Sequence, residues 1–197
     1  YDTWKLSTQF GGTSGSLNYI GNLSRFQTDG YRDHSWARRD QLNAKAKVDA
    51  QESGVVTLVV NSLDQPETQD PLGLTAAQVA QNPRQAGTNA IAFNTRKSVA
   101  QTQLGIAYGL DVTAFDHIEA RVYYGDRQIT QYLAIPLAAQ SAPTASGGVV
   151  DLDRNYGGLG LRWTHATRLA DGPLTASVGL DYDTMDEWRK GYLNNFG

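Results

Sequence analysis

Alternation of apolar and polar residues with a period of two is the main pattern along this chain. In residues 174–183, every second position is Leu, Ala, Val or Tyr, and the positions between them are Thr, Ser, Gly and Asp. Because successive side chains of a strand point to opposite faces, this pattern predicts strands with one apolar and one polar face. It recurs in eight stretches, although Ile20 and Val59 fall on the polar side: 4–10, 17–24, 41–49, 55–63, 101–108, 118–125, 159–164 and 174–183.

The connections between these predicted strands alternate between short and long. Short turns rich in Gly, Asp or Ser are expected at residues 12–15, 51–54, 111–116 and 170–173, as tight turns require. Long connections are expected at about residues 28–37, 65–97 and 135–152, with a fourth beginning near Asp186. Within the longest, Thr75 is placed to cap a short helix over residues 76–81 that ends at Asn82-Pro83.

Strands with this alternation, joined by short turns at one rim and long loops at the other, predict an all-β fold. We expect an antiparallel up-and-down transmembrane β-barrel segment. No stretch approaches the roughly 18 consecutive apolar residues of a membrane helix, and the densest apolar run is only residues 55–60. Two alternatives remain open at this point: a complete eight-stranded barrel that anchors or adheres, and a soluble β-sandwich that binds a ligand.

The composition of the chain argues against several kinds of partner and site. With 17 basic and 20 acidic residues the net charge is -3, which argues against nucleic acid as a partner. Cysteine is absent, so thiolate metal sites and disulfides are excluded. His34, His117 and His165 have no second ligand at metal spacing. Asp181 and Asp183 share one face, but hydrated charges explain them more simply than acid–base catalysis. We expect neither an enzyme nor a cofactor.

Several stretches resemble the barrel of TonB-dependent outer-membrane receptors, in particular siderophore receptors. They are DGYRDHS at 29–35, RDQLNAK at 39–45, NSLDQP at 61–66, DPLGLT at 70–75, NTRKS at 94–98 and RKGY at 189–192. Their order spans essentially the whole chain. The resemblance implies that residues 1–197 are about eight strands of a barrel of about 22 strands, with the plug domain and the other strands lying outside this sequence.

The resemblance also implies a function. Receptors of this family bind a scarce ligand at the outer face of the cell and take it up with energy from the TonB complex, which acts through the plug. We therefore expect the outer membrane of a Gram-negative bacterium, contact with membrane lipid and lipopolysaccharide, and a ferric siderophore as cargo. Copper, vitamin B12 and a quinone cofactor remain open as alternative cargoes.

Two sets of residues are candidates for the site. Arginine recognises carboxylates and catecholates with several donors, and aromatic rings add rigid apolar contact. This chemistry predicts a ligand-binding set on the outer loops and strand ends: Tyr31, Arg32, His34, Trp36, Arg127 and Tyr132. Inward-pointing charges nearer the other rim, together with Asp181, predict a set that contacts the plug: Lys45, Lys47, Glu119, Arg121 and Asp181.

Overall fold

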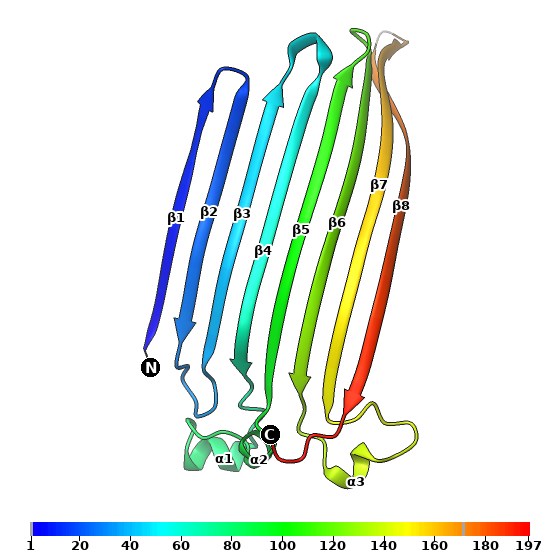
Figure 1. Ribbon diagram of the computed structural model, residues 1–197. Helices are drawn as coiled ribbons and strands as arrows, with labels where there is room; N and C mark the ends of the chain where they lie inside the picture. Colours follow the sequence, from blue (N-terminus) through cyan, green and yellow to red (C-terminus); the bar gives the residue numbers. More distant parts are fainter. Residues whose placement is uncertain (1, 171) are drawn as a thin grey trace.

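The computed structural model describes residues 2–170 and 172–197, and a single antiparallel sheet dominates it (Figure 1). Eight strands lie side by side in chain order. Their bounds are β1 Thr3–Ser14, β2 Leu17–Thr28, β3 Ala37–Asp49, β4 Val55–Gln69, β5 Arg96–Asp111, β6 Asp116–Tyr132, β7 Val149–Leu169 and β8 Gly172–Tyr192. Each strand pairs with the next over almost its whole length, which confirms the predicted up-and-down order.

The connections follow the predicted alternation, with corrected bounds. The short ones, which include η1 Gln51–Ser53, lie at one end of the sheet, and the long segments 29–36, 70–95 and 133–148 lie at the other (Figure 1). These segments hold α1 Ala76–Gln81, α2 Thr88–Ala92 and α3 Leu137–Gln140. The fourth long connection was placed too early, because β8 continues to Tyr192 by pairing with β7. In the described part of the chain no helix is long and apolar enough to cross a membrane.

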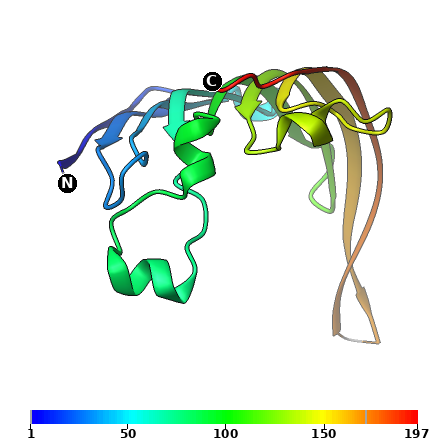
Figure 2. The same ribbon diagram turned by 90° about the horizontal axis from the view of Figure 1, so that it is seen from below.

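The eight strands form an open arc and do not close on themselves. Among the described residues, β1 pairs only with β2 and β8 pairs only with β7. Figure 2 shows the arc from below, with the α1–α2 segment on its concave side. The arrangement contradicts a closed eight-stranded barrel and, because there is one layer, a two-sheet sandwich. It is the architecture of a segment of a larger barrel.

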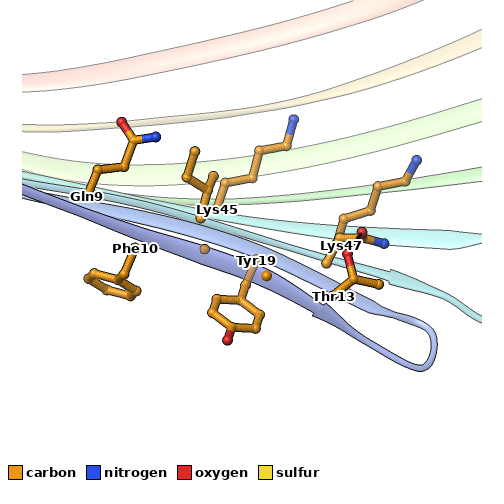
Figure 3. Close-up of a pocket in the computed structure, with 10 residues that line it drawn as sticks. Gln9, Phe10, Thr13, Tyr19, Lys45 and Lys47 are labelled. Atoms are coloured by element: carbon orange, nitrogen blue, oxygen red, sulfur yellow. Dashed lines mark hydrogen bonds between the residues drawn. The ribbon is translucent and has the colours of Figure 1, made fainter.

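The register sorts the side chains onto two faces. In the close-up of β1–β3, Phe10 and Tyr19 point to the convex side, whereas Gln9, Lys45 and Lys47 point to the concave side (Figure 3). Following the pairs across the sheet places the apolar stripe on the convex face, including Leu58, Ile106, Val122, Leu159 and Tyr182 in one continuous row.

The two apolar residues that fall on the polar side of the alternation lie on the concave face, as predicted. Ile20 and Val59 are the partners of Lys45 on its two sides. The two apolar side chains therefore flank the hydrocarbon stem of a lysine, a part of that side chain that itself packs well against apolar neighbours.

The buried part of the molecule lies at the loop end of the sheet. A single sheet has no second layer to cover its faces, so side chains become inaccessible only where the long connections fold over the strand ends. The buried apolar residues are Ala90, Phe93, Val99, Val149 and Leu152. Three polar residues are buried with them: Thr95, Gln140 and Asn194.

Asn194, which follows β8, ties two long connections together and is 1% exposed. Its amide nitrogen donates to the Phe93 carbonyl at 2.8 Å and to the Leu133 carbonyl at 3.1 Å. The Gln140 side chain accepts from the Asn194 backbone at 2.7 Å and donates to the Asn194 carbonyl at 3.1 Å. The Phe93 and Phe196 rings stack with centroids 5.4 Å apart. A polar network and one aromatic pair thus join segments 70–95, 133–148 and 193–197.

Asn194→Ala is expected to loosen these connections. The substitution leaves the buried Phe93 carbonyl and the part-buried Leu133 carbonyl without this donor. The cost is roughly 1–3 kcal/mol for a fully buried group when no water replaces the donor. Limited proteolysis of the full natural chain should show faster cleavage in segments 70–95 and 133–148. The neighbouring Leu193 is 59% exposed, so Leu193→Ala serves as the control. Equal cleavage rates in the two variants would show that Asn194 does not hold the segments.

Candidate functional site

The predicted plug-contact residues all lie on the concave face, although they come from strands far apart. Lys45 and Lys47 are on β3, Glu119 and Arg121 on β6, and Asp181 on β8. Glu119 and Arg121, the two members on β6, already form ion pairs with residues of β7 and β8. Arg121 Nη2 donates to Asp181 Oδ1 at 2.8 Å, and Arg162 Nη2 donates to Glu119 Oε2 at 2.9 Å. Their role toward a plug stays a prediction.

The contact between Arg121 and Asp181 skips a strand. Arg121 is on β6 and Asp181 on β8, and the residue between them on β7 is Gly160. One row further along the strands, Tyr123 Oη donates to Asp183 Oδ1 at 2.5 Å, and the residue between them is Gly158. The glycines leave open the space above β7 that these side chains cross.

Added Cβ atoms would close that space. At Gly160 a Cβ would lie 2.8 Å from Arg121 Nε, and at Gly158 it would lie 2.8 Å from both Tyr123 Cε1 and the backbone oxygen of Tyr182. Distances below 3.0 Å force a neighbour to move. The backbone oxygen cannot move without disturbing the β7–β8 ladder. Gly158 is therefore required by the close approach of the Tyr182 backbone and the Tyr123 ring, whereas at Gly160 the nearest atoms belong to the flexible side chains of Asp181 and Arg121.

Gly158→Ala should accordingly destabilise the sheet by about 1–3 kcal/mol, the usual cost of overpacking. The matched control is Gly105→Ala, because Gly105 also faces the concave side and a Cβ there would have no neighbour nearer than 3.7 Å. Thermal unfolding of both variants of the full natural chain, in detergent, measures the difference. A stability loss in Gly105→Ala as large as that in Gly158→Ala would contradict the steric explanation.

A cavity of about 410 Å³ lies on the same face, nearer the loop end. It is lined by residues of β5 to β8: Gln101, Tyr123, Arg127, Arg154, Tyr156, Asp183, Thr184 and Met185. It is an open hollow on one face of the sheet, and hollows of comparable size lie over β1–β3. The Tyr156 hydroxyl donates to Gln103 at 3.0 Å, and its ring lies over Gly125, where a Cβ would be 2.5 Å from Tyr156 Cζ.

Two arginines face each other in this cavity. Arg127 and Arg154 are direct cross-strand partners, and Glu187 is the next residue in the row, on β8. Arg154 forms an ion pair with Glu187. Arg127 Nε is buried and has no hydrogen-bond partner. The row therefore holds two positive charges and one negative charge.

The other predicted ligand-binding residues lie in or beside the long connections, and two of them brace these segments. Arg32 donates to three backbone carbonyls of segment 70–95: Leu72 at 2.6 Å, Gln85 at 2.9 Å and Pro71 at 3.0 Å. His34 Nε2 lies 2.8 Å from the Thr95 carbonyl. These contacts engage all three guanidinium nitrogens of Arg32 and one ring nitrogen of His34 within the protein.

The remaining three members lie next to charged or polar neighbours. The guanidinium of Arg84 lies 5.7 Å from the Tyr31 ring centroid, and that of Arg96 lies 3.5 Å from the Tyr132 ring centroid. The backbone N–H of Trp36 donates to Gln69 Oε1 at 3.2 Å. The structure thus separates Arg127, in the cavity on the sheet, from the other five, at the loop end. A ligand-binding role for the set stays a prediction.

The predicted helix cap is confirmed. Thr75 caps α1 in a reciprocal pair with Gln78, since its hydroxyl accepts from the Gln78 backbone and the Gln78 side chain accepts from the Thr75 backbone. The helix ends at Gln81, before Pro83. The segment that Arg32 contacts therefore contains a capped helix.

Sequence reasoning missed Gln101, Arg154, Tyr156 and Glu187 as neighbours of Arg127. Only Gln101 lay in a predicted strand, and the alternation placed it on the correct face. Arg154 and Tyr156 precede the predicted strand 159–164, and Glu187 fell in the connection expected from about Asp186, so the pattern assigned no face to these three. It did not place them in one row, because that depends on how far each strand is shifted against the next.

Two of the three histidines pair with carboxylates near the turn end of the sheet. His117 Nδ1 lies 2.7 Å from Asp111 Oδ1, and His165 Nδ1 lies 2.8 Å from Asp116 Oδ1. Over residues 2–170 and 172–197, no group of three or more His, Cys, Asp or Glu is arranged to hold a metal ion.

Comparison with known proteins identifies the architecture. The sequence matches no protein-family model. Among solved structures, the chain is similar to the ferric citrate transporter FecA in its unliganded form, with a TM-score of 0.71 and 20% sequence identity. The chain has the fold of a segment of a larger β-barrel. The match covers 94% of this chain and 26% of the FecA chain, so the likeness is one of fold over about a quarter of that transporter.

Proposed function

We propose that this chain is part of the barrel wall of an outer-membrane transporter that takes up a scarce ligand with energy from the TonB complex. The observation that carries the proposal is the two-faced arc: an apolar convex face and a charged concave face, in the fold of a segment of a transporter barrel. A barrel wall needs this arrangement because lipid touches one face and an aqueous interior the other.

The convex face supports the membrane location. On β8 the side chains of Val178, Leu180 and Tyr182 are 67%, 75% and 61% exposed. Soluble monomers rarely expose contiguous apolar patches of more than a few hundred Å², whereas here the apolar row crosses the sheet from β2 to β8. Membrane lipid and, at the loop end, lipopolysaccharide are the proposed partners of this face.

The concave face supports a filled interior. Its paired charges on β6, β7 and β8 offer donors and acceptors to a second domain, as a plug would require. Lys45 and Lys47 lie on the same face and are free of the ion pairs found among the described residues. We propose that the TonB complex acts through the plug and that the plug contacts five residues of this face: Lys45, Lys47, Glu119, Arg121 and Asp181.

A ferric siderophore is the proposed cargo. It is supported by the resemblance of segment 70–75 to siderophore receptors and by the likeness of the fold to a ferric citrate transporter. The proposed ligand-binding residues remain Tyr31, Arg32, His34, Trp36, Arg127 and Tyr132. For Arg32 and His34 the observed contacts predict an indirect part, in which they hold the connections that surround the ligand.

Changes of charge at two adjacent residues test the orientation of the sheet, because the expected losses of stability differ in size. Leu180 faces the convex side and Asp181 the concave side. Leu180→Lys should lower folding into lipid bilayers by about 2–4 kcal/mol if the residue lies near the bilayer midplane, because it places a charge against lipid. Asp181→Asn removes a charge from the proposed aqueous interior and should change bilayer folding much less. Similar losses in both variants would contradict the assignment of the faces.

The transport function is tested with the full natural chain in cells that lack their own ferric-siderophore receptors. Uptake of radioactive iron is measured with hydroxamate, catecholate and carboxylate siderophores, with and without TonB. We expect the full chain to restore uptake of one class, and only when TonB is present. Failure with all three classes would exclude a siderophore cargo, and TonB-independent uptake would contradict the proposed energy source.

A further inference from the structure

We propose that a hollow on the convex face, over β1 to β4, binds one lipopolysaccharide molecule, and that Arg25 and Arg38 hold a phosphate group of its lipid A part. The inference rests on the proposed function in taking the convex face as the lipid side of the wall and the loop end as the outer side. It adds a defined position and a recognised chemical group to a contact proposed above for the face as a whole.

The hollow lies where the apolar stripe of the convex face ends. It has a volume of about 630 Å³ and reaches from β1 to β4, and most of its lining residues belong to the convex face. On β2 the stripe ends at Leu23, and toward the loop end Arg25 comes next on the same face. On β3, Leu42 is followed in the same way by Asp40. The outward apolar band of a membrane barrel ends where lipid headgroups begin, so this boundary crosses the hollow.

One part of the hollow is apolar and open. It is lined by Trp4 and Leu6 on β1, which are 44% and 65% exposed, and by the cross-strand partners Leu23 and Leu42. Acyl chains that lie against these side chains remove apolar surface from water on both partners. A tryptophan at the boundary of the apolar band is also typical of a membrane interface.

The other part presents two guanidinium groups side by side, because both arginines donate to one carboxylate. Arg25 Nε lies 2.5 Å from Asp40 Oδ1 and its Nη2 lies 3.0 Å from Asp40 Oδ2, while Arg38 Nη2 lies 2.7 Å from the same Oδ2. The group of three carries one net positive charge. Within residues 2–170 and 172–197, the Nη1 atoms of both arginines have no hydrogen-bond partner. Guanidinium groups with free donors bind phosphate oxygens well.

The surroundings of the arginines place the phosphate group close to the apolar part. Asp64 is the partner of Asp40 on β4 and forms no ion pair among the described residues, so its carboxylate repels an anion from that side. On the opposite side, Leu6 is the partner of Arg25, and Gln27 is the partner of Arg38 and offers an amide. A free phosphate ion gains nothing from the apolar lining, whereas lipid A joins phosphate groups and several acyl chains in one molecule.

Native mass spectrometry of the full natural chain, purified from outer membranes in a mild detergent, tests the site. We expect the chain to retain lipopolysaccharide, and the double variant Arg25→Gln/Arg38→Gln to lower the retained fraction about tenfold, because it removes charge-assisted hydrogen bonds. The control is Arg154→Gln/Arg162→Gln, which changes two ion-paired arginines of the concave face and should leave retention unchanged. Absence of lipopolysaccharide from the unchanged protein, or equal losses in the two double variants, would overturn the proposal.

Titration of the delipidated full chain separates the possible sources of the phosphate group. The probes are lipid A, phosphatidylethanolamine and inorganic phosphate, and we expect lipid A to bind most tightly. Leu23→Ser leaves both arginines in place and should also weaken lipid A binding, which tests the hollow even if the double arginine variant does not fold. Inorganic phosphate that binds as tightly as lipid A would show a site for free anions, and equal binding of phosphatidylethanolamine would show unspecific lipid contact. Either result would refute the inference.

The lipid site and the transport function fail in different ways. Retention of lipopolysaccharide that depends on Arg25 and Arg38, in a chain that restores no siderophore uptake, would retain the lipid site and reject the siderophore cargo. Restored uptake by a chain that retains no lipopolysaccharide would retain the transporter and reject the lipid site.

Discussion

The hydrogen-bonded register between neighbouring strands is the constraint on which the rest of this structure depends. In a sheet of one layer, backbone donors and acceptors away from the edges are satisfied by the adjacent strands. The ladder is continuous apart from register shifts between Arg38 and Asp40 on β3 and between Gln65 and Thr68 on β4. Because side chains alternate along each strand, the same register decides which residues share a face and which form a row across the sheet. A shift of one residue in β7 would separate Arg121 from Asp181 and would turn Leu159 and Leu161 to the concave side.

The concave face shows how a register can create contacts between strands that are not adjacent. Two glycines on β7 allow Arg121 and Tyr123 on β6 to reach the carboxylates of Asp181 and Asp183 on β8. These contacts lie at least partly in water, where single ion pairs contribute little to stability. These contacts hold the long side chains of Arg121 and Tyr123 in defined positions across the sheet. The charged groups of this face are therefore arranged in a defined pattern.

The loop end and the sheet follow different principles. The sheet exposes most of its side chains on both faces, whereas the loop end buries a small apolar core together with Asn194 and Gln140. Buried amides that satisfy several backbone groups at once specify one arrangement of the connections they join. The three joined segments lie at one rim of the arc. The network therefore gives this rim one defined shape in place of three independent loops.

Apart from the loop-end parts of β4, β7 and β8, the sequence by itself determined the strands, their order and the face to which their residues belong, because period-two alternation and turn residues are local properties of the chain. It also located the capped helix at 76–81 and placed Lys45, Lys47, Glu119, Arg121 and Asp181 on one face. Only the tertiary structure decided which residues are neighbours in space. The pairing of Arg127 with Arg154, the bracing contacts of Arg32 and the burial of Asn194 depend on residues between 27 and 101 positions apart. No local pattern encodes such distances, since the shift between strands and the path of each long connection emerge only when the whole sheet assembles.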